Sequence, residues 1–277
     1  MRRDLLPLIR STLGDRYAVD CEIGRGGAAI VFRAKTPDGQ TVALKILRPE
    51  LSTTVTGDRF LREIRIIGTL DHPKIGRLLD SGEKDWIIYF VMPFIEGPSL
   101  DAVLKRDGKL TVPDVIRLAR DLLEALAHAH GKGIVHRDVK PDNIIVSRDG
   151  ALLLDFGIAR AVAISGTDKL TRSGIAVGTS RYMSPEQVMA VIDIDGRSDL
   201  YSVGCVLFEC LTGHPPYEHK NEVRVLQLHQ TEPIPDLGAL APHVPGGLVS
   251  IVTRALAKRP EERWQSAGAM LRAVGAL

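Results

Sequence analysis

The sequence predicts an α+β protein with two lobes, the first rich in strands and the second rich in helices. Up to Met92 the apolar stretches are short and rich in β-branched residues, which is typical of strands. Pro93 and the run Glu96-Gly97-Pro98 then interrupt this pattern. Beyond them helical periodicity dominates, beginning with a long amphipathic segment over 112–130. The expected division is a lobe over 1–92, a link over 93–97 and a second lobe over 98–277.

Length and composition fit a protein that buries a full core, either as two domains or as one domain in two lobes. The chain has 277 residues, of which 44% are hydrophobic and 25% are charged. Lys and Arg total 36 against 34 Asp and Glu, so the net charge of +2 gives no reason to expect nucleic acid or a membrane surface as a partner. The three cysteines, Cys21, Cys205 and Cys210, are too scattered for a disulfide framework or a zinc site. We expect buried, reduced thiols.

The first residues do not predict a signal peptide. Met1-Arg2-Arg3 resembles the basic start of one, but Asp4, Pro7 and Arg10 interrupt the apolar region that should follow. The longest apolar run near the middle, Ile87–Met92, is far too short to cross a bilayer. The sequence therefore predicts no membrane segment in this chain.

The first lobe contains a glycine-rich loop, CEIGRGGAAIV, over Cys21–Val31. It fits the pattern G-x-G-x-x-G except that Ala29 stands at the third glycine. A strand over Ile30–Phe32, a turn over 36–39 and a strand over Thr41–Leu47 follow. A dinucleotide-binding fold needs a helix directly after the loop, and a Walker-type loop ends in Gly-Lys-Ser/Thr, so both are excluded. The loop therefore joins strands of an antiparallel meander.

The remaining elements follow from the spacing of apolar residues. An apolar stripe predicts a helix over Asp58–Leu70, on which Glu63 lies. Short apolar runs predict strands over Ile75–Leu79 and Trp86–Met92. Further helices are predicted over 200–211 and from about Ser266 to the C-terminus.

The segment HRDVKPDNIIVSRDGALLLDFG gathers polar residues around two short apolar strands and a turn. If this hairpin is centred on Asp149, Asn143 lies opposite Asp155. An amide oxygen and a carboxylate would then lie side by side, and both are hard oxygen ligands suited to Mg²⁺. Asp138 precedes Asn143 in the loop that leads to the hairpin, and Lys140 adds a cation beside it. The segment therefore predicts a base, two metal ligands and a phosphate-binding cation in one small volume.

Several motifs now occur together and in a fixed order, and their combination resembles the protein-kinase signature set. The matching residues are the glycine loop, Val42-Ala43-Leu44-Lys45, His136-Arg137-Asp138 with Asn143, and Asp155-Phe156-Gly157. In detail the chain resembles the eukaryotic-like serine/threonine protein kinases of bacteria, from about Tyr17 to Arg263. The resemblance implies a two-lobed kinase fold with its active site in the cleft. It also implies ATP- and Mg-dependent transfer of the γ-phosphate to serine and threonine hydroxyls of proteins, in signal transduction.

The resemblance implies a role for each motif residue. Lys45, paired with Glu63, would hold the α- and β-phosphates of ATP, and Met92 would be the gatekeeper beside adenine. Asp138 would orient and deprotonate the substrate hydroxyl, and Lys140 would neutralise the transferring phosphate. Asn143 and Asp155 would hold Mg²⁺, with Mn²⁺ as an alternative. The full nucleotide-binding set is Gly24, Arg25, Gly26, Gly27, Val31, Ala43, Lys45, Met92, the backbone of Pro93 and Ile95, Asn143 and Asp155.

The segment GTSRYMSPE resembles the platform on which such kinases hold protein substrates. Thr179 and Lys140 are typical of serine/threonine rather than tyrosine kinases. Glu186, in a Ser-Pro-Glu that replaces the usual Ala-Pro-Glu, should pair with Arg263 near the end of the chain. By the same resemblance Asp199 should support the catalytic loop from the apolar helix that contains it.

The resemblance also implies regulation by phosphorylation. Thr171-Arg172-Ser173 is similar to the motif that related bacterial kinases phosphorylate in their activation loops. We expect trans-autophosphorylation at Thr171 and at Ser173, with Arg137 as the cationic receptor of the phosphate.

Two alternatives stay open beside an active protein kinase. A pseudokinase would bind nucleotide without transfer, but Lys45, Asp138, Asn143 and Asp155 are all present. A small-molecule kinase of related fold, such as an antibiotic phosphotransferase, would lack the Ser-Pro-Glu platform. The expected partners are ATP and protein substrates, with a homodimer as a family expectation and no nucleic acid. The expected location is cytoplasmic, either alone or as the cytoplasmic domain of a longer membrane-anchored kinase.

Overall fold

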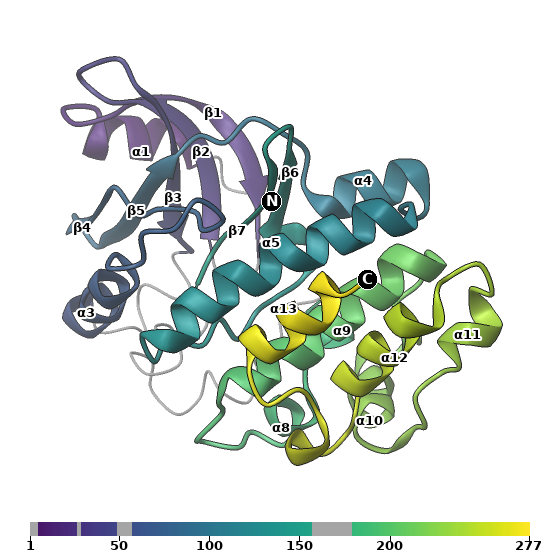
Figure 1. The fold of residues 1–277 in the computed structure, drawn as a ribbon. Coiled ribbons are helices and arrows are strands. Elements are labelled where there is room, and N and C mark those ends of the chain that lie inside the picture. Colours follow the sequence, from purple (N-terminus) through teal and green to yellow (C-terminus); the bar gives the residue numbers. More distant parts are fainter. Residues whose placement is uncertain (1–4, 27–28, 49–56, 157–178) are drawn as a thin grey trace. The chain divides into compact units, whose positions relative to one another are not determined.

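The computed structural model describes residues 5–26, 29–48, 57–156 and 179–277. They divide into two compact units (Figure 1). The first unit holds the described residues up to 71 together with 76–96, and the second holds 72–75 and the described residues from 97 onward. The first unit is built on an antiparallel sheet and the second is mostly helical, so the predicted α+β class is confirmed.

The first unit contains a five-stranded antiparallel sheet in the order β1-β2-β3-β5-β4. The glycine loop joins β1 to β2, so the predicted meander is present. Among the described residues of this unit, two helices accompany the sheet. The bounds are α1 Leu6–Leu13, β1 Ala18–Arg25, β2 Ala29–Lys35, β3 Thr41–Leu47, α3 Gly57–Ile67, β4 Asp80–Lys84 and β5 Ile87–Pro93.

The strand predicted over Ile75–Leu79 is wrong, because the strand β4 begins only at Asp80. Ile75 makes a single bridge to Leu153 of the second unit, and the Leu153 N–H donates to the Lys74 carbonyl (2.9 Å). Ile75 thus pairs outside the five-stranded sheet. The sequence of β4 is polar, as suits a strand at the edge of a sheet, and this composition concealed it.

Helix α1 and one face of the sheet enclose the core of the first unit. Ile9 and Leu13 of α1 are buried in this core. The Arg10 guanidinium donates to the carbonyls of Val19 (2.8 Å) and Asp20 (2.6 Å), which fixes α1 to the start of β1. The sheet contributes Val19, Ile30, Phe32, Ala34, Val42, Leu44, Ile46, Ile87, Tyr89 and Val91. Since side chains alternate along a strand, the residues between these point to the opposite face.

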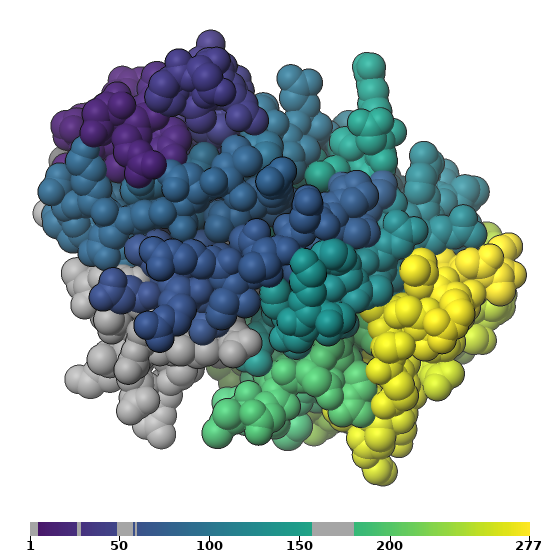
Figure 2. Space-filling model, turned by 60° about the vertical axis from the view of Figure 1, so that its left-hand side comes forward, coloured from purple at the N-terminus to yellow at the C-terminus, as the bar shows by residue number. Residues whose placement is uncertain are grey.

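The described part of the second unit is a helical bundle with a short hairpin. Its central helix, α9, is buried along almost its whole length, and α5 and α13 pack beside each other (Figure 1). Figure 2 shows α13 at the surface of this unit. The bounds are α4 Leu100–Asp107, α5 Val112–Gly131, β6 Ile144–Ser147, β7 Gly150–Leu153, α8 Pro185–Val188, α9 Gly196–Thr212, α10 Glu222–Thr231, α11 Leu237–Leu240, α12 Gly246–Ala255 and α13 Ala267–Gly275, with 3-10 turns over Pro141–Asn143, Thr179–Tyr182 and Pro260–Glu262.

The hairpin β6–β7 differs from the expected register by one residue. Ser147 pairs with Gly150, so the turn contains two residues, and Gly150 takes a φ of 113° that favours glycine. The Leu154 N–H therefore donates to the Asn143 carbonyl (2.8 Å), and Asp155 lies one residue beyond the position opposite Asn143. Asp155 itself has a φ of 65°.

Cys205 and Cys210 are buried, as predicted, whereas Cys21 is only partly buried, and all three are free thiols. Among the described residues, every helix is too short or too polar to cross a bilayer.

Candidate active site

The carboxylate of Asp138 lies among donors in the loop before β6. Lys140 Nζ lies 3.0 and 2.8 Å from its two oxygens. Asn143 Nδ2 donates to the same carboxylate (3.0 Å) and to the Asp138 carbonyl (2.8 Å). The 3-10 turn over Pro141–Asn143 brings Asn143 back to this position. The structure thus brings together three residues that the motif analysis selected.

Asp199, at the start of α9, holds the backbone in front of Asp138. Its carboxylate accepts from the N–H groups of His136 and Arg137, both at 2.8 Å. It also lies 2.8 Å from His130 Nε2. Burial alone would raise the pKa of Asp199, but the hydrogen bond with His130, the nearby imidazoles and the backbone donor outweigh it, so this pKa lies below its usual value. The expected support of the catalytic loop by Asp199 is present.

His136 links this loop to the hairpin. Its Nε2 lies 2.7 Å from the Leu154 carbonyl, and its Nδ1 accepts from the Asp138 N–H (3.1 Å). Both contacts are satisfied by the neutral ring with the proton on Nε2. The ring also packs against Phe156, with centroids 4.5 Å apart. His136 therefore fixes the residue before Asp155 relative to Asp138.

In the first unit, the strand register places the predicted nucleotide-binding side chains on one face of the sheet. Val31 pairs directly with Lys45, and Ala43 pairs directly with Met92. Direct partners share a face, and so do residues two apart on a strand, so all four lie on the face opposite α1. Lys45 is buried, and its ammonium lies 6.0 Å from the centre of the Phe90 ring.

The glycine loop has room for side chains within the protein itself. A Cβ at Gly24 would lie 3.8 Å from Val31, and one at Gly26 would lie 3.6 Å from the Ala29 carbonyl, both ordinary contacts. Gly26 N–H donates to the Ala29 carbonyl (2.8 Å), which closes the loop. The described fold therefore does not itself require glycine at 24 or 26.

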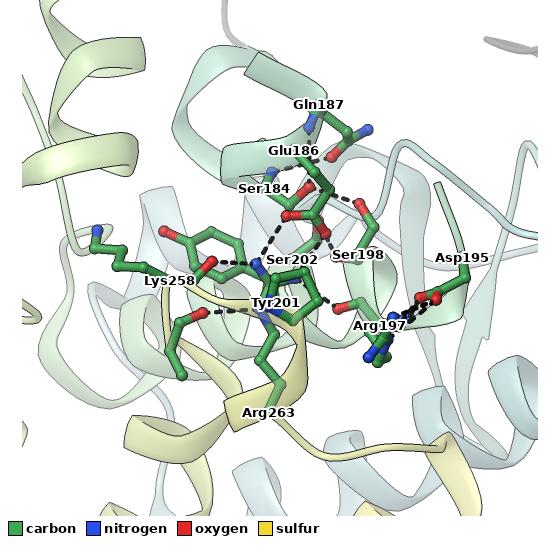
Figure 3. A network of polar contacts seen from close by, with 12 residues as sticks. Ser184, Glu186, Gln187, Asp195, Arg197, Ser198, Tyr201, Ser202, Lys258 and Arg263 are labelled. Carbon is green, nitrogen blue, oxygen red and sulfur yellow. Dashed lines mark hydrogen bonds and ion pairs between the residues drawn. The ribbon is translucent and has the colours of Figure 1, made fainter. Parts of the chain in front are cut away.

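Glu186 forms the predicted pair with Arg263 (Figure 3). Two guanidinium nitrogens donate to its two carboxylate oxygens at 2.7 and 2.8 Å. Arg263 is fully buried and also donates to the carbonyls of Ala257, Arg197 and Lys258. This charge is thus fully hydrogen-bonded, which a buried arginine requires.

The helix α8 carries Glu186 and begins with a reciprocal cap (Figure 3). Ser184 Oγ accepts from the Gln187 N–H (3.3 Å), and the Gln187 side chain accepts from the Ser184 N–H (3.0 Å). Ser184 Oγ also lies 2.6 Å from Ser198 Oγ on α9. The serine that replaces alanine in this motif therefore has a structural role.

Four predicted site residues lie outside the described part of the chain, either entirely or in their side chains. Gly27, Thr171 and Ser173 lie outside the described residues, and of Thr179 only the backbone turn is described. Arg25 is the last residue of β1, and its guanidinium pairs with Glu22 (2.7 Å).

Two side chains that no motif indicates hold the loop that carries Asp138. His130 Nε2 lies 2.8 Å from the Asp199 carboxylate, and Gln187 Nε2 donates to the Arg137 carbonyl (2.7 Å). His128 and His130 are two residues apart on α5, and this spacing indicates only that the two side chains face apart. No sequence signal shows which backbone group a glutamine will meet.

Comparisons with known proteins agree with this geometry. A family model described as "Protein kinase domain" matches residues 17–273. Serine/threonine-protein kinase PknH of Mycobacterium tuberculosis (strain ATCC 25618 / H37Rv) is 42% identical over 249 residues, which cover 89% of this chain and 39% of the relative. PknD of the same strain is 40% identical over 269 residues, which cover 96% of this chain and 40% of the relative.

A relative from another genus and a solved structure extend the comparison. The probable serine/threonine-protein kinase PknB of Corynebacterium glutamicum is 38% identical, with 96% of this chain and 42% of the relative covered. The crystal structure of Rad53 1-466 in complex with AMP-PNP matches with a TM-score of 0.74 and 25% identity, over 94% of this chain and 65% of that one. The chain spans about two-fifths of the length of the curated relatives. It belongs to the protein kinase family, in the group of bacterial serine/threonine-protein kinases.

Proposed function

We propose that this chain is a catalytic domain that transfers the γ-phosphate of ATP to serine and threonine hydroxyls of proteins, in signalling. One observation carries the proposal. The Asp138 carboxylate is bound by Lys140 and Asn143 on a loop whose backbone is held by Asp199. In this arrangement a carboxylate is positioned to bind a substrate hydroxyl, and a cation is positioned to bind a phosphate.

The chemistry needs little covalent participation by the protein. The hydroxyl oxygen of the substrate attacks the γ-phosphorus, the bond from phosphorus to the β,γ-bridging oxygen breaks, and ADP leaves with that electron pair. Asp138 orients the hydroxyl and takes up its proton. The positive charge of Lys140 stabilises the phosphoryl group during its transfer. Positioning and charge account for most of the rate.

The side chains of Asn143 and Asp155 fit a magnesium ion. Asn143 uses its Nδ2 on Asp138, which leaves the amide oxygen as an acceptor, and Asp155 supplies a carboxylate. Mg²⁺ prefers oxygen ligands of this kind, and Mn²⁺ accepts them too. When bound, the ion neutralises phosphate charge.

The residues of the first unit fit a nucleotide. Lys45, supported by Glu63, binds the α- and β-phosphates, and Val31, Ala43 and Met92 offer an apolar surface to adenine, with the backbone of Pro93 and Ile95 as its hydrogen-bond partners. Gly24, Arg25, Gly26 and Gly27 cover the phosphates with backbone N–H groups. Since the fold tolerates a Cβ at Gly24 and Gly26, the approach of a ligand explains glycine better than packing does.

Regulation and partners complete the proposal. Thr171 and Ser173 are trans-autophosphorylated, with Arg137, next to Asp138, as the phosphate receptor. A second copy of this chain is then the transient partner, and Thr179 and Glu186 belong to the platform for other protein substrates. The domain works on the cytoplasmic side of the membrane, where ATP is present. Its two lobes are residues 1–92 and 98–277, and the link between them is 93–97.

The test is a transfer assay with radiolabelled Mg-ATP and a generic protein substrate, beside Asp138→Asn. We expect label on the substrate and, by mass spectrometry, phosphate on Thr171 or Ser173. In Asp138→Asn the rate of transfer should fall at least about a hundredfold, since a general base contributes on that scale. Binding of ATP without transfer by the wild type would indicate a pseudokinase. Transfer only to small molecules would indicate a small-molecule kinase of related fold. Unmodified Thr171 and Ser173 would overturn the regulatory part alone.

A further inference from the structure

Arg137, the residue before Asp138, has an unusual backbone. Its φ is 68°, in the left-handed region that residues with a Cβ rarely adopt. Such a conformation costs free energy and persists only where the surroundings determine it. Whatever holds this peptide therefore also sets the direction from which the Asp138 side chain leaves the backbone.

Two side chains hold the peptide groups of Arg137. Its N–H donates to Asp199 (2.8 Å), as the motif analysis anticipated. Its carbonyl accepts from Gln187 Nε2 at 2.7 Å, and no motif indicated this contact. The next N–H, that of Asp138, donates to His136 Nδ1 (3.1 Å). The polar groups on both sides of the Arg137–Asp138 peptide are thus occupied.

The Gln187 amide can make these contacts in one orientation only. Its oxygen accepts from the Ser184 N–H (3.0 Å), and its nitrogen donates to the Arg137 carbonyl. One planar group therefore joins the start of α8 to the loop that carries Asp138. The helix itself is anchored through Glu186 to Arg263 and through Ser184 to Ser198 (Figure 3).

We propose that Gln187 is a positioning residue for phosphoryl transfer: its amide holds the Arg137 carbonyl and thereby orients the Asp138 carboxylate from the end of the substrate platform. The inference rests on the role of Asp138 proposed above. It makes α8, together with Asp199, a second support of the catalytic loop. The Gln187 side chain does not touch the reacting atoms, so its removal should lower kcat and leave the KM for ATP unchanged.

Gln187→Glu isolates this contact. A glutamate keeps the acceptor for the Ser184 N–H, so the cap of α8 survives, but its carboxylate cannot donate to the Arg137 carbonyl. We expect kcat to fall about tenfold at pH 7.5, because the partly buried Arg137 carbonyl loses its hydrogen-bond donor, with the KM for ATP changed less than about twofold. Gln227→Glu makes the same change of charge on an exposed face of α10 and should leave both constants unchanged.

Two further readouts separate positioning from general damage. Below about pH 6 a growing fraction of the carboxyl groups introduced by Gln187→Glu carries a proton and can donate again, so the ratio of variant to wild-type kcat should rise as the pH falls. Amide hydrogen exchange in the peptide over residues 136–143 should be at least about fivefold faster in Gln187→Glu and unchanged in Gln227→Glu, because the backbone there loses a restraint. This second readout does not need activity, so it tests the inference even if the proposed transfer reaction is absent.

A fall in kcat of less than about fivefold, or unchanged exchange over 136–143, overturns the proposal. Losing a contact that positions Asp138 must change both kcat and the rate of amide hydrogen exchange. If Gln187→Glu does not fold, Gln187→Met serves in its place, because it keeps the length of the side chain and removes its polar atoms. The same thresholds for kcat and exchange then apply, without the recovery at low pH. Ser184→Ala should destabilise α8 and lower kcat less than Gln187→Glu, since it leaves the Gln187 amide in place.

Discussion

At the scale of single residues, the site depends on groups whose partners are already set before any substrate binds. Lys140 and Asn143 hold the Asp138 carboxylate at 2.8 to 3.0 Å, and the Arg137 peptide is held at both ends. Such preorganisation lowers the reorganisation that the reaction itself must make. Motifs identified Asp138, Lys140 and Asn143 because phosphoryl transfer restricts which residue types can serve.

The glycine loop provides a prediction at this scale. Gly24→Ala should leave stability unchanged, since the added Cβ would be 3.8 Å from Val31, but should weaken ATP binding about tenfold or more by intruding on the phosphates. Ala29→Gly is the matched change at the third position of the motif. Ala29 is already the first residue of β2, paired with Leu47, so we expect its removal to change the Kd by less than about threefold.

Titration calorimetry with Mg-ATP measures both variants, with thermal unfolding as the control for folding. Equal affinity of Gly24→Ala and wild type would contradict the assignment of this loop to the phosphates. A change of orders of magnitude in Ala29→Gly would show that the third corner of the loop matters more than its place in β2 indicates.

At the scale of elements, the sequence located four of the helices, α3, α5, α9 and α13, and most of the strands, but it did not locate the other described helices or the register of the hairpin. The apolar stripes of α3, α5, α9 and α13 are long enough to predict each helix to within a few residues. The hairpin β6–β7 was misplaced by one residue, because Ser147-Arg148-Asp149-Gly150 is compatible with either turn centre and the pairing of Ser147 with Gly150 decides between them. The strand β4 was missed, because its composition is that of an exposed edge.

The helix α8 provides the prediction at this scale. It has only four residues, so it depends on its cap and on the Glu186–Arg263 pair rather than on its own propensity. Glu186→Ala would leave Arg263 buried with three carbonyl partners and no counter-charge, which should lower the free energy of unfolding by about 3 kcal/mol. Denaturant unfolding measures the loss.

The matched control is Glu261→Ala. Glu261 pairs with Arg259 in the neighbouring 3-10 turn, but both side chains are more than half exposed. Exposed pairs of this kind contribute little, so the variant should unfold at the denaturant concentration of the wild type. Equal effects of the two substitutions would mean that Arg263 is stabilised by its carbonyl partners alone.

At the scale of the whole molecule, the two units differ in what the sequence could predict about them. In the first unit, the alternation of strands separates a core face from the face of Lys45, and that alternation is visible in the sequence. In the second unit, polar residues such as Asp199, Arg263 and His229 are fully buried among helices. Their partners come from distant parts of the chain, which apolar periodicity does not encode.

The buried His229 gives the second unit a predicted sensitivity to acid. Burial, with the charge of Lys258, lowers its pKa from 6.5 to about 3, while its Nδ1 lies 2.8 Å from the Tyr201 hydroxyl. The folded state therefore binds fewer protons than the unfolded state between these values, so stability is fully present above pH 6.5 and falls as the pH drops toward 3. The titration of His229 alone should lower the free energy of unfolding by about 2 kcal/mol between about pH 7 and about pH 5.

The substitution His229→Asn tests this contribution, since it keeps a polar partner for the Tyr201 hydroxyl and removes the titrating ring. The variant should be less stable than the wild type at about pH 7 but should lose about 2 kcal/mol less on going to about pH 5. Denaturant unfolding at both pH values measures the difference. The control is His214→Asn, because that side chain is 77% exposed and its pair with Glu218 (3.7 Å), being exposed, contributes little; this variant should lose as much stability as the wild type on going to about pH 5. Parallel pH profiles for wild type and His229→Asn would mean that His229 takes up its proton as readily in the folded state as in the unfolded one.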